Sequence, residues 1–245
     1  MKHIFHVHTY RCKHASDETD EEYVKTALRL KADKITFTDH SPFPGNPFGN
    51  RMDIEQLSEY IESLKLLKEK YQHKINIEYG LEVEYLPSMV TFYEELKTLG
   101  LSQLIIGQHF YQHTDGSYSF ADDKDYNMAN EHLGCCKAMI DGIKSGLFTV
   151  VAHPDRVFRR CKTWTQEMTD ISKELISKAA YNNVILEKNM ASYEKLLEKS
   201  NYTYWRKDFW DLVDAYNQTH KKTVKTIVGL DAHSTEDMVR RELIK

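Results

Sequence analysis

Side chains that can bind metal ions stand at the ends of successive predicted strands. The first predicted strand, residues 4–8, carries His6 and His8, and side chains two residues apart point to the same face of a strand. Burying imidazoles costs free energy unless a partner pairs with them, and a metal ion is the commonest partner for two at once. Each later strand also ends in a histidine, carboxylate or asparagine: His40, Glu82, His109, His153, Asn189, Asp231 and His233.

The apolar pattern predicts about seven strands, each followed by a helix. The strands are expected near residues 4–8, 34–38, 75–83, 104–106, 148–152, 184–186 and 224–228. They are almost continuously apolar, as parallel strands buried on both faces are. Alternating strands and helices predict a parallel α/β sheet, most simply closed into a barrel, in which the strand ends meet at one face. An open doubly wound sheet is the alternative, but no G-x-G-x-x-G sequence follows the first strand.

Two segments are predicted to be loops near this face. Residues 41–51 carry three prolines and two glycines. Residues 111–124 are polar, aromatic and glycine-containing, and we expect a long loop that either walls off a substrate pocket or packs locally in solvent.

The composition limits the class of protein. With 245 residues, 41% hydrophobic and 29% charged, we expect one domain over residues 1–245. The net charge of -4 gives no reason to expect nucleic-acid binding. No apolar run approaches the roughly 20 residues of a membrane helix, and none resembles a signal peptide. The four cysteines lack C-x-x-C spacing, which favours reduced thiols and a cytoplasmic protein.

The predicted ligands are imidazoles and carboxylates without thiolates. This set favours Zn, Mn or Fe over a structural thiolate zinc site. Because the ligands are too many for one ion, a carboxylate such as Glu82 could bridge two ions roughly 3.5–4 Å apart.

The order of the motifs resembles the PHP (polymerase and histidinol phosphatase) superfamily. The resemblance spans nearly the whole chain and rests on six segments: His6-x-His8, Thr38-Asp39-His40, Gly80-Leu81-Glu82, Gly107-Gln108-His109, Ala152-His153-Pro154-Asp155 and Gly229-Leu230-Asp231-Ala232-His233. It implies a distorted (β/α)7 TIM-like barrel, a centre of three divalent metal ions, and hydrolysis of phosphate esters. Within the superfamily, the chain looks most like the histidinol-phosphate phosphatase type.

The resemblance also implies ligands for three metal sites. The first site would hold His6, His8, Glu82 and Asp231, and the second would hold Glu82, His109 and His153. The third would hold His40, His233 and one residue of the loop after the first strand. His14 is favoured for that place, and Asp17 is the alternative because other family members use an aspartate.

The remaining site residues are predicted from their neighbourhood. A hydroxide that bridges two metal ions would attack the phosphorus atom, and the Glu82 carboxylate would bind both of these ions. Asp39 is a candidate to orient a ligand or to protonate the leaving group. Arginine side chains suit phosphate binding, and three arginines follow the His-Pro-Asp segment: Arg156, Arg159 and Arg160. Of these, Arg159 or Arg160 is favoured as the phosphate-binding residue. Asn189 stands at the family's E-x-N position, and Lys188 within it either contacts substrate or is solvated.

Three functions remain open from sequence. The leading one is a phosphomonoesterase acting on L-histidinol phosphate. A second is a PHP phosphoesterase for a nucleotide, sugar phosphate or phosphotyrosine, although residues 15–18 do not supply the Asp-Asp-Gly expected of the tyrosine phosphatases. The third is a catalytically silent binding module, which the intact ligand set disfavours. The expected partner is a small phosphorylated substrate, with no nucleic acid or membrane, and the chain is expected to be a monomer or weak homo-oligomer.

Overall fold

Seven parallel strands form a sheet that is nearly closed into a barrel. The computed structural model describes residues 1–121, 130–198 and 205–245. In sheet order, the strands are β1 (His3–Val7), β2 (Lys34–His40), β3 (Asn76–Val83), β4 (Gln103–Ile106), β7 (Val150–Val151), β8 (Ile185–Asn189) and β9 (Thr226–Gly229). The two edges meet where Val7 pairs with Ala232 and the backbone N–H of Leu230 donates to the carbonyl of Phe5 at 2.8 Å. The predicted barrel is confirmed.

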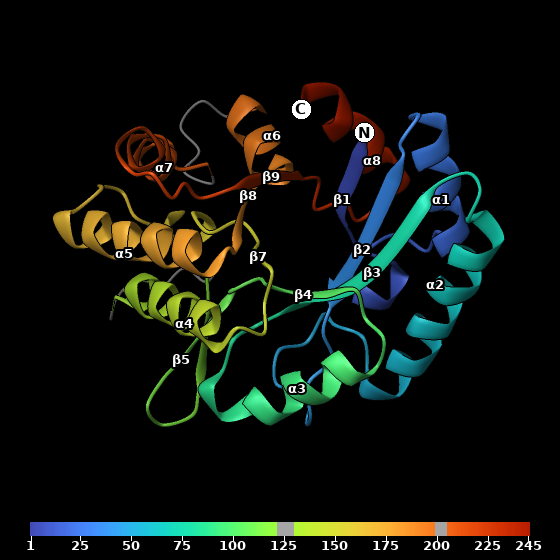
Figure 1. Cartoon of the computed structure of the whole chain (residues 1–245). Helices are drawn as coiled ribbons and strands as arrows, with labels where there is room; N and C mark the ends of the chain where they lie inside the picture. The colour runs from blue at the N-terminus through green and yellow to red at the C-terminus, as the bar shows by residue number, and fades with distance from the viewer. Residues whose placement is uncertain (122–129, 199–204) are drawn as a thin grey trace.

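The helices lie around the outside of this barrel, as Figure 1 shows. They are α1 (Asp20–Arg29), α2 (Leu57–Tyr71), α3 (Val90–Thr98), α4 (Glu131–Ser145), α5 (Gln166–Asn182), α6 (Met190–Glu198), α7 (Lys207–Thr219) and α8 (Thr235–Ile244). The larger apolar core fills the space between helices and sheet, whereas a small inner cluster comprises Phe5, Ile105, Val150 and Ala152. No helix in the described ranges has both the length and the apolar character needed to span a membrane.

Local sequence signals account for several helix starts. Thr19 precedes α1 and forms a reciprocal capping box with Glu22. At the start of α8, the Ser234 hydroxyl accepts from the backbone N–H of Asp237 at 3.0 Å, so Ser234 rather than Thr235 is the cap. These caps fix where the chain leaves the carboxyl end of the barrel and enters the next helix.

The predicted loop over residues 111–124 is interrupted by two short strands. It contains an antiparallel hairpin of β5 (Phe110–Gln112) and β6 (Tyr118–Phe120), and residues 122–124 lie outside the described residues. The strands are only three residues long, so their alternation is too brief to stand out from a polar, aromatic loop. The strand expected over residues 148–152 also shrinks to Val150–Val151.

Candidate metal centre

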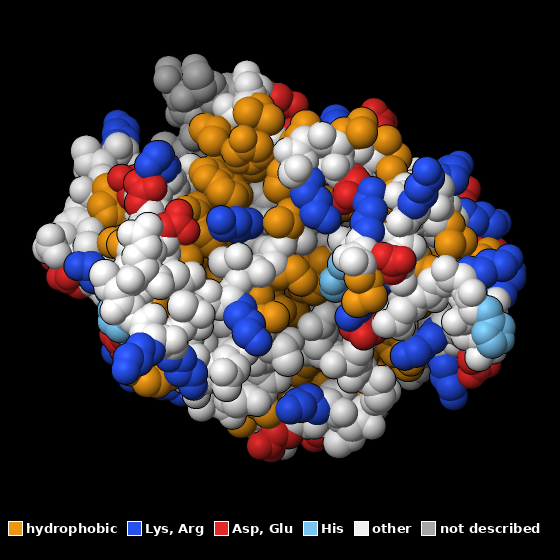
Figure 2. Space-filling model, turned by 45° about the horizontal axis from the view of Figure 1, so that its top comes forward, with side chains coloured by type: hydrophobic (Ala, Val, Ile, Leu, Met, Phe, Trp, Pro, Cys, Tyr) orange, Lys and Arg blue, Asp and Glu red, His pale blue; other side chains and the backbone are white. Residues whose placement is uncertain are grey.

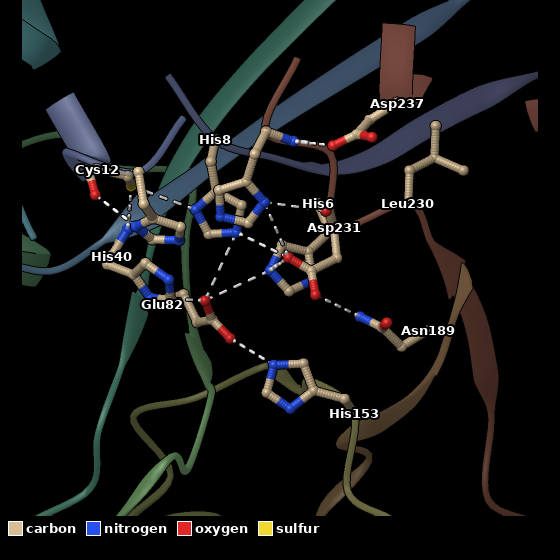
Figure 3. A network of polar contacts seen from close by, with 12 residues as sticks. His6, His8, Cys12, His40, Glu82, His153, Asn189, Leu230, Asp231 and Asp237 are labelled. Carbon is tan, nitrogen blue, oxygen red and sulfur yellow. Dashed lines mark hydrogen bonds and ion pairs between the residues drawn. The ribbon is translucent and has the colours of Figure 1, made fainter. Parts of the chain in front are cut away.

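Histidines and carboxylates from six parallel strands converge at the carboxyl end of the barrel. Figure 3 shows the side chains of His6, His8, His40 and His153 around Glu82 and Asp231. Every predicted strand-end ligand is at this place: His6, His8, His40, Glu82, His109, His153, Asp231 and His233. The parallel sheet explains the convergence, since its carboxyl ends all face the same side.

Glu82, on β3, lies at the centre of the cluster. Its Oε1 is 2.9 Å from Nε2 of His153, and its Oε2 is 2.9 Å from Nδ1 of His40. Nε2 of His6 and of His8 lie 3.5 and 3.7 Å from Oε2. A carboxylate approached from both sides by imidazoles has the placement that a bridging ligand needs.

A first group of ligand atoms comes from β1 and from the segment after β9. Oδ1 of Asp231 lies 3.3 Å from Nε2 of His8 and 3.9 Å from Nε2 of His6. The Asn189 amide donates to the other Asp231 oxygen at 3.1 Å, so this side chain orients a ligand. The sequence predicted that these three ligands share a site, and their ligand atoms lie within 4.8 Å of one another.

Two further groups of ligand atoms overlap at His40. His40, Glu82 and His109 make one, and His8, His40 and His233 make the other. His40 therefore adjoins both the predicted second and third sites. The rings of His8 and His233 stack with centroids 4.2 Å apart. His153 belongs to none of the groups found among the described residues and lies beside Glu82, and a separate group joins His8 with Cys12 and Asp39.

The loop after β1 brings His14 rather than Asp17 to the cluster. The His14 ring centroid lies 4.4 Å from that of His233 and 5.4 Å from that of His40. Asp17 and His14 are both exposed, and neither belongs to the ligand groups found among the described residues, so the ring contacts to His233 and His40 are what favour His14.

The cluster fits divalent metal ions. Buried nitrogens that make no hydrogen bond to the described part of the chain face the cluster: His6 Nε2, His8 Nε2, His40 Nδ1 and His233 Nε2. Leaving buried polar atoms without a hydrogen bond costs free energy even where a carboxylate oxygen is near, and a coordinated cation would recover this cost.

The protonation states of three ligands, His8, His40 and Glu82, suit metal binding. Burial lowers the pKa of His8 to about 3 and holds the pKa of His40 well below its ordinary value. Burial alone would raise the pKa of Glu82, but the neighbouring imidazoles, His40 and His6 first, hold it well below its ordinary value. Neutral imidazole and ionised carboxylate are the forms that bind metals. His6 differs, because against the effect of burial the carboxylates of Glu187 and Glu82 raise its pKa well above the ordinary value, so a bound metal would have to displace its proton.

Three residues behind the ligands were missed by sequence reasoning. Nδ1 of His6 lies 2.5 Å from Oε1 of Glu187, and Nδ1 of His109 lies 2.7 Å from Oε1 of Glu84. Nδ1 of His8 lies 3.4 Å from the thiol sulfur of Cys12. Such contacts fix the ring orientation and leave the other nitrogen for a metal. For two of them the sequence held a signal: Glu187 belongs to the Glu-Lys-Asn segment, and Glu84 lies two residues after Glu82.

Two glycines in the motifs make room for the carboxylates of Glu82 and Glu187. A Cβ on Gly107 would lie 1.9 Å from Oε1 of Glu82, and a Cβ on Gly229 would lie 1.7 Å from Oε1 of Glu187. No side chain fits at such distances, so both positions require glycine.

The backbone at three candidate ligands is left-handed. His6 has a φ of 67°, Asp231 a φ of 51° and His153 a φ of 32°. At His6 the pairing of β1 with β2 shifts, since Phe5 pairs with Thr36 and Val7 with the next residue, Phe37. Non-glycine residues in this region cost of order 1–3 kcal/mol each, and they gather at functional sites. The bulge, rather than regular alternation, aims His6 at the cluster.

We expect Glu187→Gln to weaken metal binding roughly 10- to 100-fold, because it removes the charged partner that orients His6. Titration with a competing chelator measures this affinity. Glu174→Gln, on the exposed side of α5, is the matched control. Equal affinities for the two variants would show that Glu187 does not support the metal centre.

Asp39 lies behind the candidate ligand His8, and Lys188 points away from the cluster. The Asp39 carboxyl is buried behind His8 and accepts from the backbone N–H and hydroxyl of Thr9, at 2.7 and 2.5 Å. Nζ of Lys188 lies 5.5 Å from the Trp210 ring, because strand alternation turns it away from the inward-facing Glu187 and Asn189. A substrate contact by Lys188 is therefore unsupported.

A cavity of about 530 Å³ opens beside the cluster. Figure 2 shows Lys and Arg side chains around a recess that holds hydrophobic side chains and histidine. The lining includes three phenylalanines and four cationic side chains: Phe48, Phe110, Phe120, Arg51, Arg156, Lys195 and Arg241. Of the three predicted phosphate-binding arginines, Arg156 lines this cavity. Arg159 is buried and donates to the carbonyl of Ala121, and Arg160 is exposed, so neither favoured arginine is in the lining.

Several known proteins are similar to this chain in sequence or in fold. The chain is 26% identical over 261 aligned residues to the histidinol-phosphatase of Bacillus subtilis, covering 95% of this chain and 94% of that protein. The fold is similar to that of histidinol phosphate phosphatase from Lactococcus lactis, a structure with zinc, L-histidinol and phosphate, at a TM-score of 0.74 and 18% identity, covering 99% and 91% of the two chains. The hisK protein of Listeria monocytogenes gives a TM-score of 0.77 at 17% identity, covering 98% of each. The PHP domain family model matches residues 5–191, more than half of the sequence. The chain therefore belongs to the PHP domain family.

Proposed function

We propose that this protein is a metal-dependent phosphomonoesterase that hydrolyses L-histidinol phosphate to L-histidinol and phosphate. The observation that carries the proposal is the complete strand-end ligand cluster at the floor of a cationic cavity. The full-length similarity to a histidinol-phosphatase names the substrate.

Each part of the site has a role in this reaction. Glu82, His6, His8 and Asp231 would hold divalent ions, which when bound lower the pKa of water and withdraw charge from the phosphoryl group. The buried barrel end excludes bulk water, so charges there act in a low dielectric. Arg156, in the cavity lining, is placed to approach the phosphoryl oxygens. Phe48, Phe110 and Phe120 offer an apolar wall for the imidazole of the leaving group.

The deciding assay is phosphate release from a panel of monoesters by the metal-reconstituted protein. We expect kcat/KM for L-histidinol phosphate to exceed that for phenyl phosphate and for a sugar phosphate by at least about 10-fold, the scale of one or two added contacts. Equal values across the panel would remove L-histidinol phosphate as the substrate. They would favour the second candidate, a PHP phosphoesterase of broader or different specificity.

We further propose three divalent ions per chain, of zinc, manganese or iron. His14, close to His40 and His233, supports the third position. The chain is proposed to act in the cytoplasm as a monomer or weak homo-oligomer, on a small phosphorylated substrate and not on nucleic acid. Elemental analysis and sedimentation measure the metal content and the oligomeric state.

A further inference from the structure

Arg51 lies in the cavity wall, at the end of the proline- and glycine-rich segment that sequence analysis left without a function. Its side chain is 3% exposed, and its guanidinium carbon lies 5.1 Å from the Phe48 ring and 5.9 Å from the Phe110 ring. All three residues line the cavity beside the metal centre. A buried guanidinium among aromatic rings retains its charge and therefore needs anionic partners.

The protein supplies this guanidinium with one anionic partner. Nη2 of Arg51 donates to Oε1 of Glu84 at 2.5 Å. Nε and Nη1 are buried and make no hydrogen bond within residues 1–121, 130–198 and 205–245. The same Glu84 also accepts from the backbone N–H of His109 and lies 2.7 Å from its ring nitrogen, so one carboxylate is shared between the arginine and a candidate metal ligand.

Arg241, another cation of the lining, is held differently. It donates to Oε2 of Glu194 and to the carbonyls of Leu230 and Asp231, and its Nη2 lies 3.4 Å from a carboxylate oxygen of Asp237. The guanidinium of Arg241 already donates to these protein groups, so its role is to position the segment that carries Asp231. Arg51 differs because two of its three nitrogens have donors left for a ligand.

We propose that Arg51 is a substrate-binding residue that donates from Nε and Nη1 to the oxygens of the transferred phosphoryl group. Its place is consistent with this role, because Glu84 ties it to His109 at the edge of the metal cluster. Arginine suits this role because its planar guanidinium can donate hydrogen bonds to two phosphate oxygens at once. The inference rests on the proposed phosphomonoesterase function.

Inorganic phosphate, as the reaction product, probes this contact without turnover. We expect Arg51→Met to weaken phosphate binding to the metal-loaded protein roughly 10- to 100-fold by calorimetry, the value of a charge-assisted hydrogen bond. It should lower kcat/KM for L-histidinol phosphate and for phenyl phosphate by similar factors, because both esters share the phosphoryl group. The metal content should equal that of the wild type. Arg29→Met, an exposed arginine on α1, removes the same charge and should change neither quantity.

Several outcomes would overturn the proposal. Unchanged phosphate affinity in Arg51→Met would do so, as would a loss of bound metal that accounts for the lost activity, since Arg51 would then only support Glu84. If Arg51→Met does not fold, Arg51→Lys decides: it keeps a positive charge near Glu84 without the fork, and phosphate affinity equal to wild type would refute the bidentate contact. A wild type that binds phosphate but does not hydrolyse L-histidinol phosphate would refute the proposed substrate while leaving the Arg51 test intact.

Discussion

Glu82→Gln is expected to lower kcat by at least about 10²-fold, the scale on which a single group that stabilises a transition state acts. Five imidazoles approach this carboxylate within 3.8 Å, and their number explains why its pKa lies well below the ordinary value despite burial, which acts in the opposite direction. A neutral amide cannot replace a charged ligand shared between cations, so metal content should fall together with activity. Phosphate release and elemental analysis on the same preparation measure both.

Glu78→Gln is the matched control for this substitution. Glu78 lies on the same strand, β3, at the opposite end of the barrel, where its carboxylate lies 2.7 Å from Nζ of Lys34. Removing this partly exposed ion pair should change stability by less than about 1 kcal/mol and leave kcat unchanged. A Glu82→Gln protein that retains most of its activity and metal would exclude Glu82 as the bridging ligand.

The barrel and the position of the cluster were predictable because both follow from local periodicity. Apolar strands separated by helices indicate a parallel sheet, and any residue at the carboxyl end of such a strand must lie at the shared face. His40, His109 and His153 are 44 or more residues apart along the chain, yet their strand-end positions were enough to bring them together.

What could not be predicted depends on contacts between distant segments. The left-handed backbone at His6 is a bulge, which has no signal in a short apolar strand. The pairing of His6 with Glu187 joins residues 181 positions apart. Arg51 was treated as the end of a loop, because a sequence pattern cannot show that a lone arginine is buried between Phe48 and Glu84. For Lys188, the alternation of side chains along a strand would have indicated that it points away from the face of Glu187 and Asn189.

The loop after β1 carries both candidates for the ligand that sequence analysis left open, and His14→Ala tests the assignment to His14. This loop is fixed at two points: Arg11 is buried and donates to both Asp20 and Glu59, and the backbone N–H of Ser16 donates to the carbonyl of His233 at 2.8 Å. Such anchoring gives His14 a defined position instead of a mobile one.

His14→Ala is expected to remove one bound ion per chain and to lower kcat/KM by at least roughly 10-fold, the lower limit for disturbing a metal ligand shell. Nδ1 of His14 lies 2.6 Å from the carbonyl of Cys12, so the ring can donate there and leave Nε2 directed to a metal beside His233 and His40. Asp17→Ala removes an exposed carboxylate three residues further on and should retain both metal and activity. Elemental analysis after reconstitution compares the two variants. Loss of the ion in Asp17→Ala with retention in His14→Ala would reverse the assignment, because the loop would then have to turn Asp17 inward when metal binds.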